Sequence, residues 1–329
     1  MSYKSLPKIE LHHHLEGAAP PALVRDMARA RGLDVGGIFA PDGSYAYRDF
    51  AEFLQVYEVA TRPFSSPDDY ALLTAIVAGE AAEQGVVYLE TFLAPDFCGG
   101  RDPVAWQEYL AAMIEAAAAA EQLGITLRGI ITAVRHAGPE AARETARCAQ
   151  ETAGDFIVGF GMGGAETAGA TADFAYAFDM AREAGLRLTS HAGEWAGPQS
   201  VREALTHLKV ERVGHGVRAI EDSALVAELA DRGIVLEVCP GSNVALGVYP
   251  DLATHPVAKL REAGVKVTIS TDDPPFFHTD MTREYEQLDR TFGWDERDFA
   301  ALNRVALDAA FCDDRTRAMI AERLEPKDA

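Results

Sequence analysis

The chain has 329 residues, and 51 Asp and Glu against 30 Lys and Arg give a formal net charge of −21. So acidic a chain is a poor partner for nucleic acid, because binding to phosphates requires clustered Lys and Arg. With 48% apolar and 25% charged residues, the composition is typical of a globular protein and excludes a disordered one. A free small molecule is therefore the expected partner.

No apolar run approaches the roughly 18 residues that a membrane span needs, and residues 1–8 lack the apolar part of a secretory signal. The cysteines, at positions 98, 148, 239 and 312, are far apart and form no CxxC pair. Such cysteines in a chain of this length indicate reduced thiols. We expect a cytoplasmic protein without a membrane partner, and its oligomeric state stays open.

Short β-branched runs alternate with longer amphipathic stretches along most of the chain. Strands are predicted at 8–15, 86–92, 125–134, 156–160, 186–191, 211–215, 234–239 and 265–271. Helices are predicted between them, near 103–122, 139–151, 172–184, 199–207, 222–231 and 255–262. Eight strands that alternate with helices indicate an α/β fold with a parallel sheet, closed into a (β/α)8 TIM barrel.

The stretch 16–85 is far longer than one crossover requires, and it predicts a helical insertion after strand one. Helices are expected there near 21–31, 48–60 and 67–84. In such a barrel this insertion lies over the C-terminal face, where active sites are built. After the last strand, extra C-terminal helices are expected near 281–291, 295–309 and 313–323. No linker or repeat is evident, so residues 1–329 are expected to form a single domain.

Three consecutive histidines end the first predicted strand. Side chains alternate along a strand, so His12 and His14 lie on one face and His13 on the other. Two imidazoles that converge at a barrel mouth form half of a metal site. An expression tag or a packed core histidine would also explain these histidines, although the surrounding apolar strand pattern argues against a tag.

Other polar side chains end later strands: His191 the fifth, His215 the sixth, and Asp272 with Asp273 the eighth. The C-terminal ends of parallel strands gather at one rim of a barrel, so these groups should converge. Three nitrogens and one oxygen suit Zn²⁺ with a position left for water. The expected zinc ligands are His12, His14, His191 and Asp272.

Glu194 follows His191 by three residues, after a small Ala-Gly turn, and can enter the site as a general acid or base without being a ligand. His215 and Asp273 remain to orient or deprotonate the attacking water. Two-metal barrels of this kind commonly bridge their metals with a modified lysine after strand four. Residues 156–166 contain no lysine, so one Zn²⁺ per chain is expected.

Residues 6–17, together with 191–194, 214–216 and 271–274, resemble the adenosine/adenine deaminase family of the amidohydrolase superfamily. The resemblance runs in order from residue 6 to about 312. It implies the same four zinc ligands, Glu194 as the donor of a proton to purine N1, and His215 and Asp273 beside the attacking water.

The resemblance also implies substrate contacts, from the backbone N–H of Gly164 and from Glu16. His14 and Asp273 are expected to border the substrate as well. Gly164 could instead be a plain tight-turn glycine, which needs no such role.

Adenosine deaminases usually have an aspartate that contacts the ribose where Glu16 stands, and glutamate is more typical of the adenine-deaminating branch. Against this, residues 163–166 and 214–216 resemble the adenosine enzymes, although Ala165 replaces their usual aspartate. The interpretation favoured here is hydrolytic deamination of adenosine and deoxyadenosine, giving inosine from adenosine, plus ammonia. The alternative is adenine or another 6-aminopurine.

More remote alternatives are another amidohydrolase on the same barrel or a binding protein without catalysis. The presence of Glu194 and of every ligand argues against a silent protein. The roles of two groups of residues stay open. Arg135 and His136 could lie behind the site or on an exposed rim. A helix with Asp49, Phe50, Phe53 and Leu54 could cap the base or belong to the core.

Overall fold

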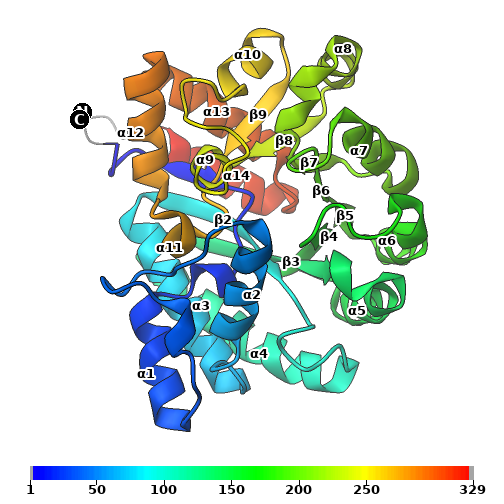
Figure 1. Ribbon diagram of the computed structural model, residues 1–329. Helices are drawn as coiled ribbons and strands as arrows, with labels where there is room; N and C mark the ends of the chain where they lie inside the picture. Colours follow the sequence, from blue (N-terminus) through cyan, green and yellow to red (C-terminus); the bar gives the residue numbers. More distant parts are fainter. Residues whose placement is uncertain (1–2, 326–329) are drawn as a thin grey trace.

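The computed structural model describes residues 3–325 and has a barrel of parallel strands with helices around it (Figure 1). The strands are β1 (Lys8–Glu10), β2 (Val86–Leu93), β3 (Thr126–Val134), β4 (Ile157–Gly163), β5 (Arg187–Leu188), β6 (His191–Ala192), β7 (Arg212–His215), β8 (Val235–Val238) and β9 (Lys266–Ile269). They pair in parallel and in chain order, from β1 to β5 and from β6 to β9. The predicted α/β class and TIM-barrel fold are confirmed.

Two seams between these runs are closed by backbone hydrogen bonds. β5 and β6 are the two ends of the predicted fifth strand. Thr189 between them donates to the carbonyl of Phe160 in β4 at 3.1 Å, and Leu188 in β5 accepts the N–H of Glu211, next to β7, at 2.9 Å. At the other seam, His14 donates to the carbonyl of Asp272 at 3.0 Å, and Asp272 donates to that of His12 at 3.1 Å. The first strand is shorter than predicted, yet its continuation pairs with the end of β9.

The helices are α1 (Pro21–Arg31), α2 (Phe50–Thr61), α3 (Pro67–Glu83), α4 (Pro103–Ala120), α5 (Pro139–Thr152), α6 (Ala175–Glu183), α7 (Pro198–Glu203), α8 (Ser223–Arg232), α9 (Pro240–Ala245), α10 (Val257–Glu262), α11 (Pro274–Phe277), α12 (Met281–Phe292), α13 (Glu296–Ala309) and α14 (Asp314–Leu324). None of the helices within residues 3–325 is long and apolar enough to cross a membrane. The predicted insertion is α1 to α3, and the predicted C-terminal helices are α12 to α14.

Local sequence signals explain where many of these helices begin. The side chains of Asp49 and Ser66 accept backbone N–H groups in the first turns of α2 and α3, and Asp102 does the same for α4. Proline stands at the first position of α3 and α4, where its missing N–H costs no hydrogen bond. The short helices α9 and α11 also start with proline, but they are too brief to show a hydrophobic period, and the sequence did not predict them.

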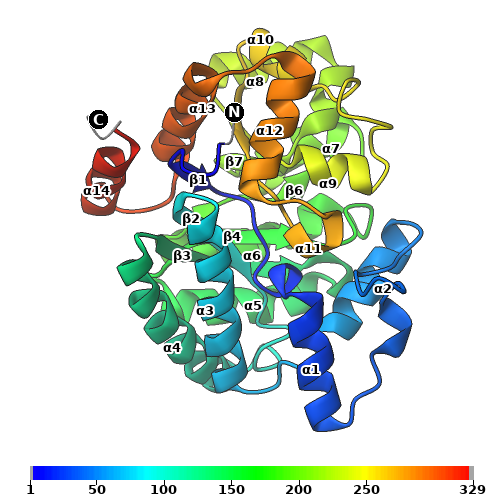
Figure 2. The same ribbon diagram turned by 90° about the vertical axis from the view of Figure 1, so that its left-hand side faces the viewer.

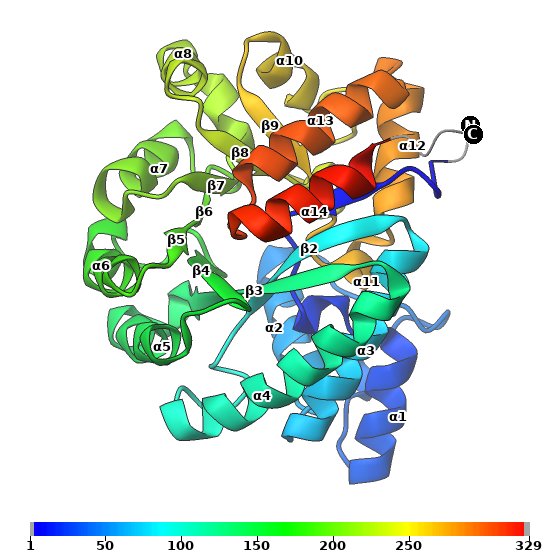
Figure 3. The same cartoon turned by 180° about the vertical axis from the view of Figure 1, so that it is seen from behind.

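The two ends of the barrel are covered differently. Helices α2, α9 and α11 lie over the end that faces the viewer in Figure 1, whereas α13 and α14 cross the opposite end in Figure 3. The side view in Figure 2 separates the same two groups. The C-terminal ends of the strands therefore open toward α2, α9 and α11, where the insertion was expected to lie.

A fully buried arginine stabilises the barrel interior near its N-terminal end. The guanidinium of Arg212 donates to Glu237 at 2.6 Å and to Glu90 at 2.7 Å, and it lies 3.5 Å from the ring centroid of Phe311. It also donates to the carbonyl of Ala309 at the end of α13. One cation thus balances two buried carboxylates and ties the C-terminal helices to the barrel.

Replacing this arginine should destabilise the fold far more than replacing a comparable exposed one. Arg212→Leu leaves Glu90 and Glu237 without their counter-charge, and breaking a buried pair typically costs about 3–5 kcal/mol. Arg187 is the matched control, because it pairs with the half-exposed Glu211 and also lies against the ring of Phe311. Arg187→Leu should cost less than about 1 kcal/mol in chemical denaturation. Equal losses for the two variants would contradict this account.

Candidate active site at the C-terminal ends of the strands

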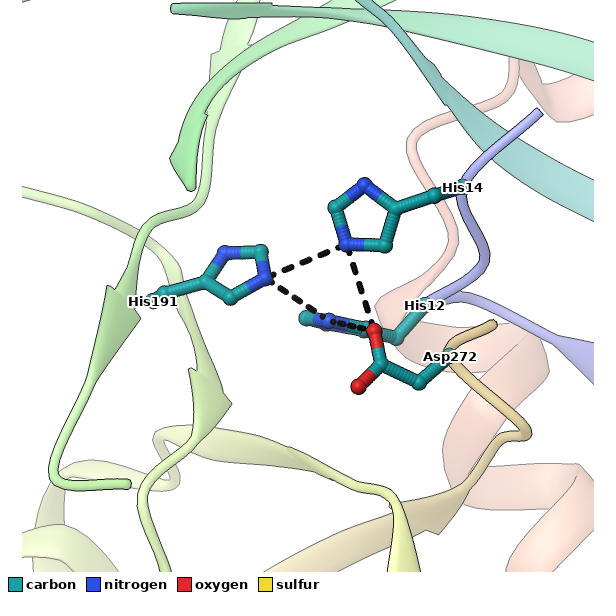
Figure 4. Close-up of side chains that lie close together, drawn as sticks. All are labelled: His12, His14, His191 and Asp272. Carbon is teal, nitrogen blue, oxygen red and sulfur yellow. Dashed lines mark hydrogen bonds and ion pairs between the residues drawn. The ribbon is translucent and has the colours of Figure 1, made fainter. Parts of the chain in front are cut away.

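Four predicted ligands converge at the barrel mouth, as Figure 4 shows: His12, His14, His191 and Asp272. We call these four residues the ligand cluster. The Nε2 atom of His191 lies 3.1 Å from that of His12 and 3.2 Å from that of His14. Oδ1 of Asp272 lies 3.4 Å and 3.2 Å from the Nε2 atoms of His12 and His14. Ligand atoms that bind tetrahedral zinc at 2.0–2.1 Å are about 3.3–3.4 Å apart, so the spacing fits such an ion.

The hydrogen bonds behind the ligands set their tautomers for metal binding. Nδ1 of His12 donates to Glu237 at 2.8 Å, and Nδ1 of His191 donates to the carbonyl of Met162 at 2.9 Å. In a neutral imidazole the other nitrogen then carries a lone pair, which leaves both Nε2 atoms free to bind a cation. The hydroxyl of Ser242 donates to the second oxygen of Asp272 at 2.7 Å.

The electrostatics of the cluster favour one positive charge at its centre. Burial lowers the pKa of His14, and it lowers that of His191 well below the usual range. Although burial opposes it, hydrogen bonds to Asp272 and Glu237 raise the pKa of His12 to about 9. Either a proton on His12 or a metal ion supplies this charge, and only a metal ion contacts all four ligand atoms at once.

Close packing at the site explains two glycines and two strained residues. A Cβ at Gly214 would lie 2.9 Å from the His12 ring, and one at Gly17 would lie 1.6 Å from the Asp273 carboxylate. Two non-glycine site residues, His215 and Asp272, have φ values of 58° and 68°. Such backbone conformations are unfavourable for most residues and persist where the surrounding structure enforces them.

Glu194 and His215 lie beside the ligand cluster, as predicted. Their side chains are buried, with Oε2 of Glu194 3.8 Å from Nε2 of His215. Burial raises the pKa of Glu194 well above its usual value, and the charges of Asp272 and Glu166 add to this rise. A carboxyl group whose pKa is raised in this way holds its proton to higher pH than an exposed one, as a general acid requires.

Asp273 follows the ligand Asp272 and lines the same cavity. Burial raises its pKa well above the usual range, as do the neighbouring charges of Asp272 and Glu194. Within residues 3–325, its buried Oδ1 atom has no hydrogen-bond partner. An unpaired buried oxygen is costly, so this atom is a candidate for contact with a bound ligand.

A cavity of about 720 Å³, including its open mouth, adjoins the ligand cluster. Helix α2 contributes an apolar wall through Phe50, Phe53, Leu54 and Tyr57. The capping interpretation of this helix is thereby supported, while Asp49 caps the helix itself. Such a wall suits the faces of a flat heterocycle.

Gly164 also lines the cavity, and its conformation requires glycine. Its φ is 93°, and a Cβ there would lie 2.8 Å from Nδ1 of His136. His136 lies on the cavity wall and accepts the N–H of Ala165 at 3.3 Å. Arg135 lies behind the same loop, where its Nε donates to the carbonyl of Ala168 at 2.7 Å. Of the two positions left open above, His136 is therefore at the exposed rim and Arg135 is behind the site.

Glu16 is on the short 3-10 helix η1 (Glu16–Ala18), directly after the histidine strand, and lines the cavity. It is only 3% exposed, and burial raises its pKa to about 7. The hydroxyl of Tyr70 donates to its Oε1 at 3.2 Å. The backbone N–H of Ala94 also favours its ionised form, and a carboxylate oxygen can accept a further hydrogen bond from a ligand.

Glu166 has a role at the site that the sequence analysis missed. Its carboxylate accepts the backbone N–H groups of Gly193, Glu194, Trp195 and Ala196, at 2.5–3.1 Å. It therefore fixes the loop that carries Glu194. Spacing gave no signal for this role, because the bonds join segments 27–30 residues apart.

Three further residues were missed at the end of β8 and just after it: Glu237, Ser242 and Asn243. The last two lie at the same rim as the ligands, so the rule used for the other strand ends would have found them. Asn243 is fully buried, and its amide contacts both Glu194 and His215.

Comparisons with known proteins agree with this geometry. The family model described as adenosine deaminase matches residues 7–327. A protein of Agrobacterium fabrum described as an adenine deaminase is 48% identical over 320 residues, covering 97% of this chain and 98% of its own. The solved structure of an adenine deaminase from Arthrobacter aurescens is 28% identical, with a TM-score of 0.88 and coverage of 97% and 98%.

An amidohydrolase from Burkholderia ambifaria, solved with bound zinc, is 27% identical with a TM-score of 0.84, and the match covers 98% of this chain and 93% of that one. A match along nearly the whole length, in sequence and in fold, accompanies a ligand cluster and a buried acid at the expected strand ends. The chain belongs to the adenosine deaminase family of hydrolases.

Proposed function

We propose that this chain binds one Zn²⁺ and hydrolyses adenine at C6, which gives hypoxanthine and ammonia. From the sequence alone, adenosine ranked ahead of adenine. The relatives described as adenine deaminases support the alternative better, at up to 49% identity over nearly the full length. We therefore reverse the order of the two substrates.

The observation that carries this choice is the buried carboxyl of Glu16. Free adenine has an N9–H that can donate a hydrogen bond, whereas a nucleoside has a sugar at that position. Glutamate reaches one methylene farther into the cavity than the aspartate expected of an adenosine enzyme. It thereby reduces the room for a sugar and offers an acceptor to N9–H, and a hydrogen bond to the ionised form of such a group contributes about 1.5–3 kcal/mol.

The remaining residues supply the steps of a hydrolytic deamination. Glu194 donates its proton to N1, which makes C6 a better electrophile. Gly164 offers its backbone N–H to the ring, and His215 and Asp273 lie beside the attacking water. When bound by His12, His14, His191 and Asp272, Zn²⁺ supplies Lewis-acid chemistry that makes water a nucleophile at neutral pH. As water adds to C6, one of its protons restores Glu194 and the other goes to the amino group, which leaves as ammonia.

Metal analysis tests the ligand set. The purified chain should contain one equivalent of zinc, and His12→Ala should lose both metal and activity because three ligands hold the ion poorly. His13→Ala is the matched control, since His13 faces away from the cluster and its Nδ1 pairs with the Thr91 hydroxyl. That variant should keep its zinc. Two equivalents of metal, or a loss in His13→Ala as deep as in His12→Ala, would refute the assignment.

Glu194→Gln tests the proton donor. The variant keeps its size but cannot donate an acidic proton, so turnover should fall at least about 10²-fold while zinc stays bound. Wild-type activity should decline as pH rises through the raised pKa of Glu194, because only the protonated form donates. The residual activity of the variant should lack this decline. Glu58→Gln, at the half-exposed rim of the same cavity, should behave like wild type.

Substrate comparison tests the role of Glu16. Measured by the loss of ultraviolet absorption, kcat/KM should be highest for adenine, ahead of adenosine, deoxyadenosine and adenosine monophosphate. Glu16→Ala should lower kcat/KM for adenine by about ten- to a hundred-fold, whereas Glu58→Ala should leave it unchanged. A wild-type preference for adenosine, with Glu16→Ala harming adenosine most, would show that the carboxylate contacts a sugar and would overturn the proposal.

A further inference from the structure

Asn243 connects the two titratable groups beside the ligand cluster to a second histidine that the mechanism does not use. Its Nδ2 atom lies 3.3 Å from Nδ1 of His215 and 3.4 Å from Oε1 of Glu194. Its Oδ1 atom lies 3.2 Å from Nε2 of His255. All four residues are buried, so these contacts are protected from competition by bulk water.

The direction of the chain of hydrogen bonds is set at its outer end. The backbone N–H of Val257, at the start of α10, donates to Nδ1 of His255 at 3.2 Å. A backbone N–H can only donate, so this nitrogen must carry a lone pair. Burial lowers the pKa of His255 to about 3, and the neutral ring therefore holds its one hydrogen on Nε2. That hydrogen faces Asn243.

His255 in turn fixes the orientation of the Asn243 amide. The N–H at Nε2 of His255 requires an acceptor opposite it, which is the amide oxygen. If the amide were turned over, two donors would face each other at 3.2 Å in a buried site. The amide NH₂ group must therefore face the catalytic side, where its hydrogens are donated to His215 and Glu194.

The orientation of the amide determines where both partners hold their hydrogens. Nδ1 of His215 accepts from Asn243, so the hydrogen of the neutral ring lies on Nε2. Oε1 of Glu194 also accepts, so the acid proton lies on Oε2. The two proton-bearing atoms are 3.8 Å apart, and Nε2 of His215 is 3.9 Å from Oδ2 of Asp272. These distances are too long for direct hydrogen bonds and leave both hydrogens open to a bound molecule.

We propose that Asn243 and His255 are positioning residues that hold His215 as the Nε2–H tautomer, so that His215 acts as a hydrogen-bond donor toward the oxygen that adds to C6. The inference deepens the proposed function and rests on it for the identity of the reaction. A preorganised donor at such a position typically contributes about 10²–10³-fold to kcat.

The direct test is ¹⁵N NMR of the metal-loaded protein with ¹⁵N-labelled histidine, of which the chain has nine. The ring signals of His215 are assigned by their loss in His215→Gln. In the wild type, Nε2 of His215 should be protonated and Nδ1 bare. A wild-type His215 protonated on Nδ1 would overturn the proposal.

Asn243→Asp should reverse the tautomer, because a carboxylate oxygen in place of the NH₂ group accepts from Nδ1 of His215. With zinc retained, kcat should fall about 10²-fold while KM changes little. A variant that keeps the Nε2–H tautomer, or a wild-type kcat after the tautomer has reversed, would contradict the proposal.

Two substitutions of His255 separate positioning from packing. His255→Gln keeps a donor near the position of Nε2, whereas His255→Leu removes it and lets the amide turn. Activity and tautomer should be largely retained in His255→Gln and lost in His255→Leu. Equal damage in both would indicate packing alone and would refute the positioning role. Because the NMR readout needs no substrate, the tautomer can be correct even if adenine proves to be the wrong substrate.

Discussion

Closure of the barrel at the seam between β1 and β9 is the constraint on which the site depends. His12 and His14 come from the start of the chain and Asp272 from near its end, and the two backbone hydrogen bonds across this seam bring them together. The same bonds fix the register, so that two imidazoles of one strand and the carboxylate of another face the same centre. His191 completes the set from β6, the end of the fifth strand at the barrel mouth, where it pairs with Gly214 of β7. An ion at this point therefore joins the first, fifth and last strands of the barrel.

Buried ion pairs connect the N-terminal end of the barrel to the ligand cluster. Arg212, placed against the Phe311 ring, holds Glu237 in position, and although burial opposes it, the arginine keeps the pKa of that carboxyl below its usual value. Glu237 accepts the N–H of His12 and so presents the opposite nitrogen of the ring to the ligand cluster. One carboxylate thus contacts both the buried arginine and the candidate metal site, which places part of the control of the site in the barrel core.

The sequence predicted the parts of this molecule that depend on local pattern. Strand and helix periods predicted the fold, and the rule that sites lie at the C-terminal ends of parallel strands predicted that the four candidate ligands and Glu194 would lie together. It could not give the roles of Glu166 and Glu237, because these arise from hydrogen bonds across the fold rather than from spacing. Asn243 lies at the rim that the rule identifies, but its hydrogen bonds to Glu194 and His215 could not be read from the sequence. The interruption of the fifth strand was also invisible, since residues 186–191 read as one β-branched run. The choice between adenine and adenosine depends on a single methylene at Glu16, and a sequence pattern is a poor guide to the effect of so small a difference.

The acidic lining of the cavity restricts the class of substrate, and this argument does not depend on Glu16. Glu194 and Asp273 are buried near Asp272, and carboxyl groups so close in a medium of low dielectric constant do not all ionise. Protonated acids donate to ring nitrogens, whereas ionised ones repel anions. Among the described residues that line the cavity there is no lysine or arginine to bind a phosphate. A neutral 6-aminopurine with several ring acceptors matches this lining. A nucleoside phosphate would bring two negative charges to a cavity whose described lining has no basic side chain, in a chain whose net charge is already −21.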